Sequence, residues 1–129
     1  MQVGKLVRGD LDVTFSNDGN ASLGSPVEYR IIIDNDSDAP VTIVSLVDDK
    51  YPGIVCEDGI GDVVGRALAA DDGDGDVTAE DGPDALVCIF SETAPPPGQS
   101  PLTDTITVIV QDSDGDEGSD HDDATVTTV

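Results

Sequence analysis

The chain has 129 residues, a length that suits one domain, and its 28 acidic residues against 5 basic ones give a formal net charge of −23. A protein this anionic repels nucleic acid and anionic membrane surfaces, so both classes of partner are excluded. No run of about 20 apolar residues occurs, and we therefore expect no insertion into a membrane.

The acidic residues are mostly aspartate, with 23 Asp against 5 Glu. Aspartate alternating with glycine in loops is typical of calcium sites, where short carboxylates and backbone carbonyls converge on a hard cation. Bound cations would also offset the self-repulsion of so many like charges. Adaptation of the surface to high salt is the alternative, although such a surface is expected to use both acids. We predict Ca²⁺ as the cofactor.

Short apolar stretches with a period of two run along the chain, separated by turn-forming residues. The segments Asn-Asp-Gly-Asn at 17–20 and Asn-Asp-Ser-Asp at 35–38 predict turns. This pattern predicts an all-β, immunoglobulin-like antiparallel β-sandwich of about 7–8 strands. The alternating stretches are Leu11 to Phe15, Val27 to Ile33, Val41 to Val47, Leu86 to Phe90, Leu102 to Val110 and Ala124 to Thr128.

Three stretches interrupt the alternation. Residues 57–84 form an Asp- and Gly-rich insert, and residues 94–101 form a proline-rich connector of polyproline type. Residues 112–123 are predicted to form an acidic loop between two strands. Because the sequence holds no internal repeat, residues 1–129 are expected to make one module, with residues 1–15 as a linker or a donor strand.

The two cysteines are Cys56 and Cys88. Cys88 has the strand parity of Leu86 and Phe90 and should point inward, whereas Cys56 ends another apolar stretch. A Cys56–Cys88 disulfide would close a loop around the acidic insert and stabilise the fold by about 3–4 kcal/mol. It would also fit an oxidising compartment. Two buried free thiols are the alternative.

Part of the insert is similar to the loop of an EF-hand without its helices, with Gly75 at the turn glycine. Ala70 stands at the first ligand position and breaks the pattern, while Pro83 prevents a regular exiting helix. A solvated acidic loop is the alternative. The ligands predicted here are Asp71, Asp72, Asp74, Asp76, Thr78 and Asp81.

A second acidic cluster occupies residues 112–123. Aspartates at alternate positions of an extended segment place their carboxylates on one side, where a cation could bridge them. Such a site could lie at a junction between successive modules. The alternative is a charged hairpin tip that blocks edge-to-edge association. The predicted ligands are Asp112, Asp114, Asp116, Asp120, Asp122 and Asp123, joined by Asp48 and Asp49 from the end of another strand.

Five short blocks resemble the repeat domains of large bacterial and archaeal surface proteins, the DUF11-like, Ig-like extracellular modules. The blocks are PVEYRIIIDN (26–35), VTIVSLVDDKY (41–51), ALVCIF (85–90), DTITVIV (104–110) and SDHDDATVT (119–127). The resemblance covers about residues 22–129 and departs at the insert 57–84, which shorter members lack. It implies a structural or adhesive repeat, extracellular or on the cell surface, with no catalytic machinery.

Nothing in the sequence favours an enzyme. The single histidine, His121, has only oxygen-bearing neighbours, and four aromatic residues are too few for a sugar-binding cleft. We expect a calcium-stiffened structural repeat or filament subunit of a surface fibre, stalk or adhesin. Its partners would be neighbouring copies or modules, with residues 1–15 available for donor-strand exchange. The alternative is an adhesion module that binds carbohydrate or protein through its loops.

Overall fold

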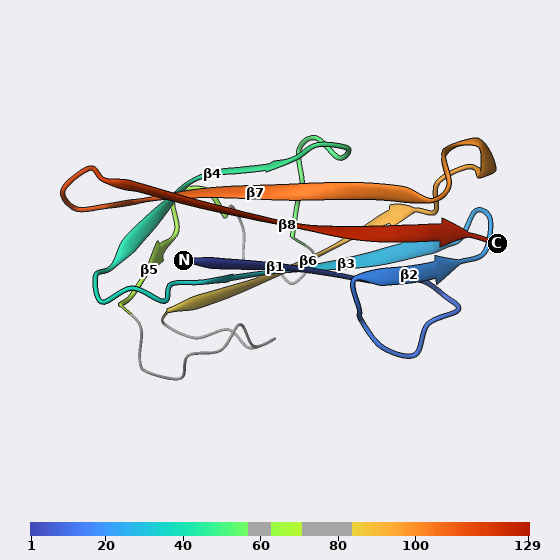
Figure 1. Cartoon of the computed structure of the whole chain (residues 1–129), viewed down its shortest axis with the longest axis horizontal. Helices are drawn as coiled ribbons and strands as arrows, with labels where there is room; N and C mark the ends of the chain where they lie inside the picture. The colour runs from blue at the N-terminus through green and yellow to red at the C-terminus, as the bar shows by residue number, and fades with distance from the viewer. Residues whose placement is uncertain (57–62, 71–83) are drawn as a thin grey trace.

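The computed structural model describes residues 1–56, 63–70 and 84–129. Within these residues, eight strands form two sheets packed face to face, and one short 3-10 turn lies between two of the strands (Figure 1). The all-β sandwich predicted from the alternation is therefore confirmed. No helix in the described part of the chain has the length and apolarity needed to cross a bilayer.

The smaller sheet has three antiparallel strands in the order β1-β3-β6. Alternate residues of its central strand, from Val27 to Ile33, are buried against the other sheet, as the period of two predicts. The strands are β1 (Gln2–Arg8), β3 (Pro26–Asp34) and β6 (Ala85–Thr93).

The larger sheet has five strands in the order β2-β8-β7-β4-β5. The β2–β8 pair is parallel and the others are antiparallel. The proline-rich connector before β7 contains the 3-10 turn Pro97–Gln99. The strands are β2 (Asp18–Ala21), β4 (Val41–Asp48), β5 (Ala67–Leu68), β7 (Leu102–Asp112) and β8 (Glu117–Thr128).

The chain crosses from one sheet to the other between β1 and β2, and here the sequence-based assignment was wrong. The predicted strand from Leu11 to Phe15 is a loop in which Leu11 is 54% exposed, and the predicted turn at 17–20 contributes to β2. Asp12 closes this loop by accepting hydrogen bonds from the N–H groups of Gly9 and Asn20, both at 2.8 Å. A Cβ at Gly9 would lie 2.1 Å from the Asn20 carbonyl oxygen, so the closure requires glycine.

A bulge in β4 reverses the predicted orientation of its second half. The pairing with β7 shifts between Ile43 and Ser45, so one residue is inserted and the inward face changes parity. Val47, predicted to face the core, is 58% exposed, whereas Asp48 is buried. The bulge therefore brings an aspartate into the interior of the sandwich.

The acidic stretch 112–123 is mostly strand rather than loop. β7 and β8 pair as far as Gln111 and Glu117, leaving a tight turn between them. The Asp112 Oδ1 atom accepts the N–H groups of Asp114 at 2.9 Å and Asp116 at 3.0 Å, which holds the turn. The long loop predicted here is wrong because these local bonds let the ladder continue through the acidic residues.

Cys56 and Cys88 form a disulfide with a Cα–Cα distance of 5.2 Å, as predicted. Cys88 is fully buried in β6 and belongs to the hydrophobic core. Figure 1 shows the two termini toward opposite ends of the long axis of the sandwich.

Candidate functional site

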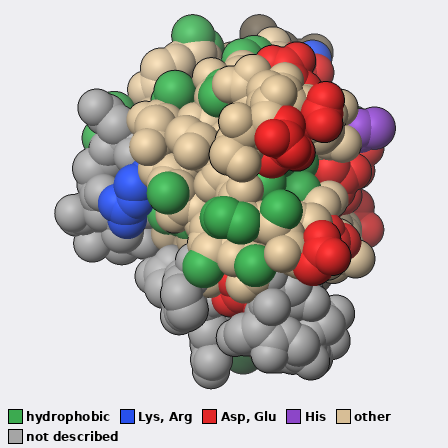
Figure 2. Space-filling view, turned by 90° about the vertical axis from the view of Figure 1, so that its left-hand side faces the viewer, with side chains coloured by type: hydrophobic (Ala, Val, Ile, Leu, Met, Phe, Trp, Pro, Cys, Tyr) green, Lys and Arg blue, Asp and Glu red, His purple; other side chains and the backbone are tan. Residues whose placement is uncertain are grey.

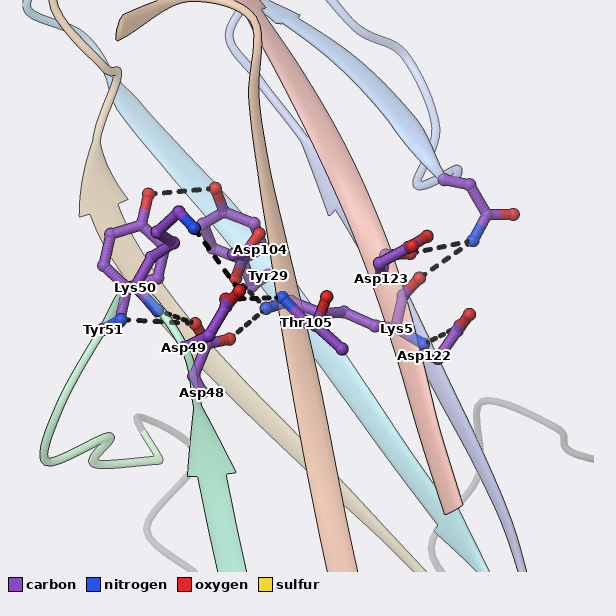
Figure 3. A network of polar contacts seen from close by, with 11 residues as sticks. Lys5, Tyr29, Asp48, Asp49, Lys50, Tyr51, Asp104, Thr105, Asp122 and Asp123 are labelled. Atoms are coloured by element: carbon purple, nitrogen blue, oxygen red, sulfur yellow. Dashed lines mark hydrogen bonds and ion pairs between the residues drawn. The ribbon is translucent and has the colours of Figure 1, made fainter.

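Three charged side chains meet inside the sandwich. Lys5 comes from β1, Asp48 from the end of β4 and Asp104 from β7, and all three side chains are 0% exposed. Lys5 therefore reaches from the smaller sheet to two strands of the larger one (Figure 3). We call these three residues the interior cluster.

Strand parity explains two members of the interior cluster. Lys5 lies between the buried residues Val3 and Val7 on the inward face of β1. Asp104 has the parity of Ile106 on β7 and faces inward as well. Neither Lys5 nor Asp104 was predicted as a site residue.

The two carboxylates of the interior cluster are held differently. Lys5 Nζ donates to Oδ2 of Asp48 and to Oδ2 of Asp104. Asp48 Oδ1 also accepts the backbone N–H groups of Lys50 at 2.9 Å and Tyr51 at 3.2 Å. Asp104 Oδ1 is buried and has no hydrogen-bond partner in the described structure. Asp48 is thus the better-stabilised anion of the two.

Aromatic rings lie beside the Lys5 amine. Its Nζ atom lies 4.8 Å from the ring centroid of Tyr29 and 5.6 Å from that of Phe90. The hydroxyl of Tyr51 contacts that of Tyr29 at 3.2 Å. Three of the chain's four aromatic residues thus gather at this one cluster. Their rings lower the local polarity, which strengthens the electrostatic contacts inside.

The surroundings shift the pKa values of Asp48 and Asp104 in opposite directions. Burial and the neighbouring Asp48 raise the pKa of Asp104 to about 7, against the lowering effect of Lys5. Burial also opposes the charge on Asp48, but hydrogen bonds from Asp104, Lys5 and the Lys50 N–H outweigh it and lower the pKa of Asp48. Below neutral pH the interior cluster therefore contains one carboxylate and one neutral carboxylic acid.

A second group of contacts closes the free edge of β1. The N–H of Val3 donates to Asp120 Oδ2 at 2.8 Å, and the N–H of Lys5 donates to Asp122 Oδ2 at 2.6 Å. Further along, the N–H of Val7 donates to the carbonyl of Ser16 at 2.7 Å. Alternate N–H groups of this edge therefore find acceptors outside the β1–β3 ladder.

Of the predicted calcium ligands, the structure brings together Asp112, Asp114 and Asp116 at the β7–β8 turn. One carboxylate oxygen from each lies within 4.8 Å of the others. Asp112 is partly buried and the other two are exposed. These three residues form the hairpin cluster.

The other predicted ligands are dispersed. Asp120 and Asp122 bond to β1, Asp48 belongs to the interior cluster, and Asp123 is exposed. Asp49 Oδ1 accepts the N–H of Thr105 at 2.8 Å, which ties the end of β4 to β7. The ligands predicted in the insert, Asp71, Asp72, Asp74, Asp76, Thr78 and Asp81, lie outside the described residues.

A hollow of about 320 Å³ lies beside the hairpin cluster. Met1, Asn35, Val41, Asp112 and Asp116 are among the residues that line it, so the hairpin and the start of β1 share one end of the molecule. Figure 2 shows this end, where acidic side chains gather on one side of the face with hydrophobic side chains next to them.

No family model matches the chain, and no curated protein matches it. The resemblance to DUF11-like surface repeats therefore stays a prediction from the sequence.

Proposed function

We propose that the chain is a structural module of an extracellular fibre, stalk or adhesin that carries tension along its long axis. The observation that carries this proposal is the attachment of the first strand to the opposite sheet. Lys5 joins β1 to β4 and β7 through the interior cluster, while Asp120 and Asp122 join β1 to β8.

The arrangement of the terminal strands suits such a load. β1 and β8 lie side by side, and Val3 and Lys5 follow the same direction as Asp120 and Asp122. The termini point toward opposite ends of the sandwich (Figure 1). Tension applied to the two ends would slide β1 along β8, so the contacts between these strands would resist together rather than one at a time.

The Cys56–Cys88 disulfide supports a location outside the cell, because such bonds persist in oxidising compartments and are rare in the cytosol. The partners we propose are neighbouring copies or modules of the same protein. Donor-strand exchange would require β1 to leave β3 of its own chain, with which it pairs along its whole length.

For calcium, the proposal is restricted to the hairpin cluster among the described residues. Ca²⁺ takes about six to eight oxygen ligands, and the three carboxylates supply only part of this set. Asp112 Oδ1 already accepts two N–H groups, which leaves Oδ2 for an ion. The cluster lies at the end of the sandwich near Met1, where a preceding module would add oxygen ligands and an ion would stiffen the junction.

The hollow beside Met1 favours a second candidate function, the binding of a small polar ligand at the loops of this end. Its volume of about 320 Å³ is near the lower limit for ligand sites. A glycan array probed with the folded chain tests this candidate, and binding that survives substitution of the residues lining the hollow would exclude it.

Single-molecule force spectroscopy tests the load-bearing role. The chain would be placed between two handle domains joined at residues 1 and 129 and pulled apart. We expect the unfolding force to fall in the Asp120→Ala/Asp122→Ala double variant, because the contacts between β1 and β8 are lost. The matched control is Asp123→Ala, which removes an exposed charge from the same strand. An equal force for the double variant and the control would refute the proposal.

A further inference from the structure

The interior cluster is a costly way to hold two sheets together. Taking charged groups out of water costs several kcal/mol for each ion, and well-packed apolar residues of similar volume are often at least as stabilising. The chain nevertheless buries Lys5, one of its two lysines, against two aspartates. A chemical role for the amine would account for this arrangement better than an ion pair does.

The contacts of the two aspartates indicate which carboxyl group an amine would attack and which one would transfer protons. Among the described residues, Oδ1 of Asp104 has no hydrogen-bond partner, while Oδ2 accepts the Lys5 amine. A neutral carboxylic acid is attacked by an amine far more readily than a carboxylate is. Asp48, held as an anion by the Lys50 and Tyr51 N–H groups, also contacts Lys5 Nζ and is placed to take its proton.

We propose that Lys5 and Asp104 are joined by an intramolecular amide bond between Nζ and Cγ, formed by the chain itself with Asp48 as the catalytic acid–base residue. The bond would link β1 of the smaller sheet to β7 of the larger one.

The step balances without any co-reactant. Asp48 takes one proton from the Lys5 ammonium, and the neutral amine attacks Cγ of the Asp104 carboxylic acid to form the C–N bond. Asp48 then moves a second proton from the nitrogen to the departing hydroxyl, and the C–O bond breaks to release water. The products are a neutral amide, one water molecule and a protonated Asp48, and the total charge is zero before and after.

Two features of the structure favour this condensation. The reacting groups are fixed in contact, and correctly oriented intramolecular groups reach effective molarities of about 10⁵ to 10⁸ M. Burial beside the rings of Tyr29 and Phe90 excludes water and disfavours the ionised form of Asp104, which an amine attacks poorly. The reaction also removes two charges from the interior, which lowers the desolvation cost.

The bond would change the path of a load between the two ends. Force entering at residue 1 would pass through Lys5 directly into β7, and residues 6–103 would not extend. The amide itself rests on the chemistry of the interior cluster and not on the proposed function. A chain that forms the bond but carries no load in its natural setting would contradict only the latter.

Intact mass spectrometry of the purified full chain after disulfide reduction tests the amide. We expect a mass lower than that of the sequence by one water. Fragmentation of a digest should yield a branched peptide that joins residue 5 to residue 104. An unmodified wild-type mass overturns the proposal without any variant, and so does a branch that maps to Asp48 instead of Asp104.

Variants separate this reaction from the loss of water at Asp-Gly sequences, which can dehydrate to succinimides. Lys5→Met should restore the full mass, whereas Lys50→Met removes the exposed lysine but keeps its backbone N–H and should still lose water. Loss of water from Lys5→Met to the wild-type extent would refute the proposal. Asp104→Asn should release ammonia instead, so its final mass should equal that of the cross-linked wild type.

Asp48→Asn keeps the side-chain volume and tests the acid–base role. We expect this variant to fold, as judged by circular dichroism. Most of its molecules should keep the full mass of the sequence, because no carboxylate takes the Lys5 proton. Incubation should then form the amide at least tenfold more slowly than in the wild type. Condensation at the wild-type rate would remove Asp48 from the mechanism.

Discussion

The backbone N–H of Val3 donates to Asp120 Oδ2 over 2.8 Å, which joins the edge strand of one sheet to a strand of the other. The N–H of Lys5 makes the equivalent bond to Asp122 at 2.6 Å. The two carboxylates thus supply acceptors that a neighbouring strand would otherwise provide. They occupy an edge that would otherwise be open to pairing with another chain.

Asp120→Ala and Asp122→Ala should each lower the free energy of unfolding by about 1–3 kcal/mol, because each leaves a β1 N–H without its charged acceptor. Urea unfolding measures this change. Hydrogen exchange should show faster exchange at the amide of Val3 in the first variant and of Lys5 in the second.

Asp123→Ala is the control for both, since it removes the same charge from an exposed position of β8. Its free energy of unfolding should stay within about 0.5 kcal/mol of the wild-type value. A loss of stability equal to that of the other two variants would mean that charge, and not the bonds to β1, is responsible.

Reduction of the Cys56–Cys88 disulfide should lower the free energy of unfolding by about 3–4 kcal/mol, because the unfolded chain loses a loop constraint. Guanidinium unfolding with and without a reducing agent measures the difference. A Cys56→Ala/Cys88→Ala double variant should unfold at the midpoint of the reduced chain and show no response to the reducing agent. A midpoint unaffected by reduction would contradict the prediction.

The sequence predicted the orientation of β3 well because its inward positions are all apolar. In β3 the alternation from Val27 to Ile33 reports burial directly. The alternation failed at Leu11 to Phe15 and in the second half of β4. A sheet crossing and a bulge determine the structure there, and both depend on tertiary contacts such as the packing of Gly9 against Asn20.

The interior cluster could not be found in this way, although part of the signal was present. Lys5 and Asp104 interrupt apolar alternation at inward positions, but a charged residue at such a position is ordinarily taken as exposed. Asp48 faces inward only because of the bulge in β4. The approach of three residues so distant in sequence follows from the strand order, which one sequence does not reveal.

Clustering along the sequence was a poor guide to clustering in space. The stretch 112–123 is mostly strand, so its neighbouring acids point to opposite faces. Asp120 and Asp122 face β1 and Asp123 faces solvent, while only the turn keeps its three aspartates together. The charge count therefore predicted an acidic surface without predicting which acids share a site.

Asp12 should make the first loop sensitive to acid. Burial opposes its charge, but the N–H groups of Asn20 and Gly9 outweigh this effect and lower the pKa of Asp12 below its usual 3.8. A lowered folded-state pKa stabilises the protein above pH 3.8, and the contribution is lost as the pH falls through the folded-state pKa. Asp12→Ala should therefore cost about 1 kcal/mol at neutral pH and less in acid.

Urea unfolding of wild type and Asp12→Ala across this pH range measures the loss. The exposed Asp18 provides a charge-matched control, and Asp18→Ala should show a smaller difference in the free energy of unfolding from wild type. A penalty for Asp12→Ala that persists undiminished below the pKa of Asp12 would show that its hydrogen bonds do not depend on its charge.

Removal of calcium should lower the melting temperature if an ion occupies the hairpin cluster, because an ion that binds only the folded chain stabilises it by about 2.7 kcal/mol at one hundred times its dissociation constant. Thermal melts in CaCl₂ and in EDTA measure the shift.

Asp114→Asn/Asp116→Asn should abolish this shift while keeping the N–H groups that Asp112 accepts. The charge-matched control is Asp18→Asn/Asp123→Asn, which should keep the shift. An identical midpoint in CaCl₂ and EDTA would exclude calcium, and a shift that persists in the hairpin variant would place the ion elsewhere in the chain.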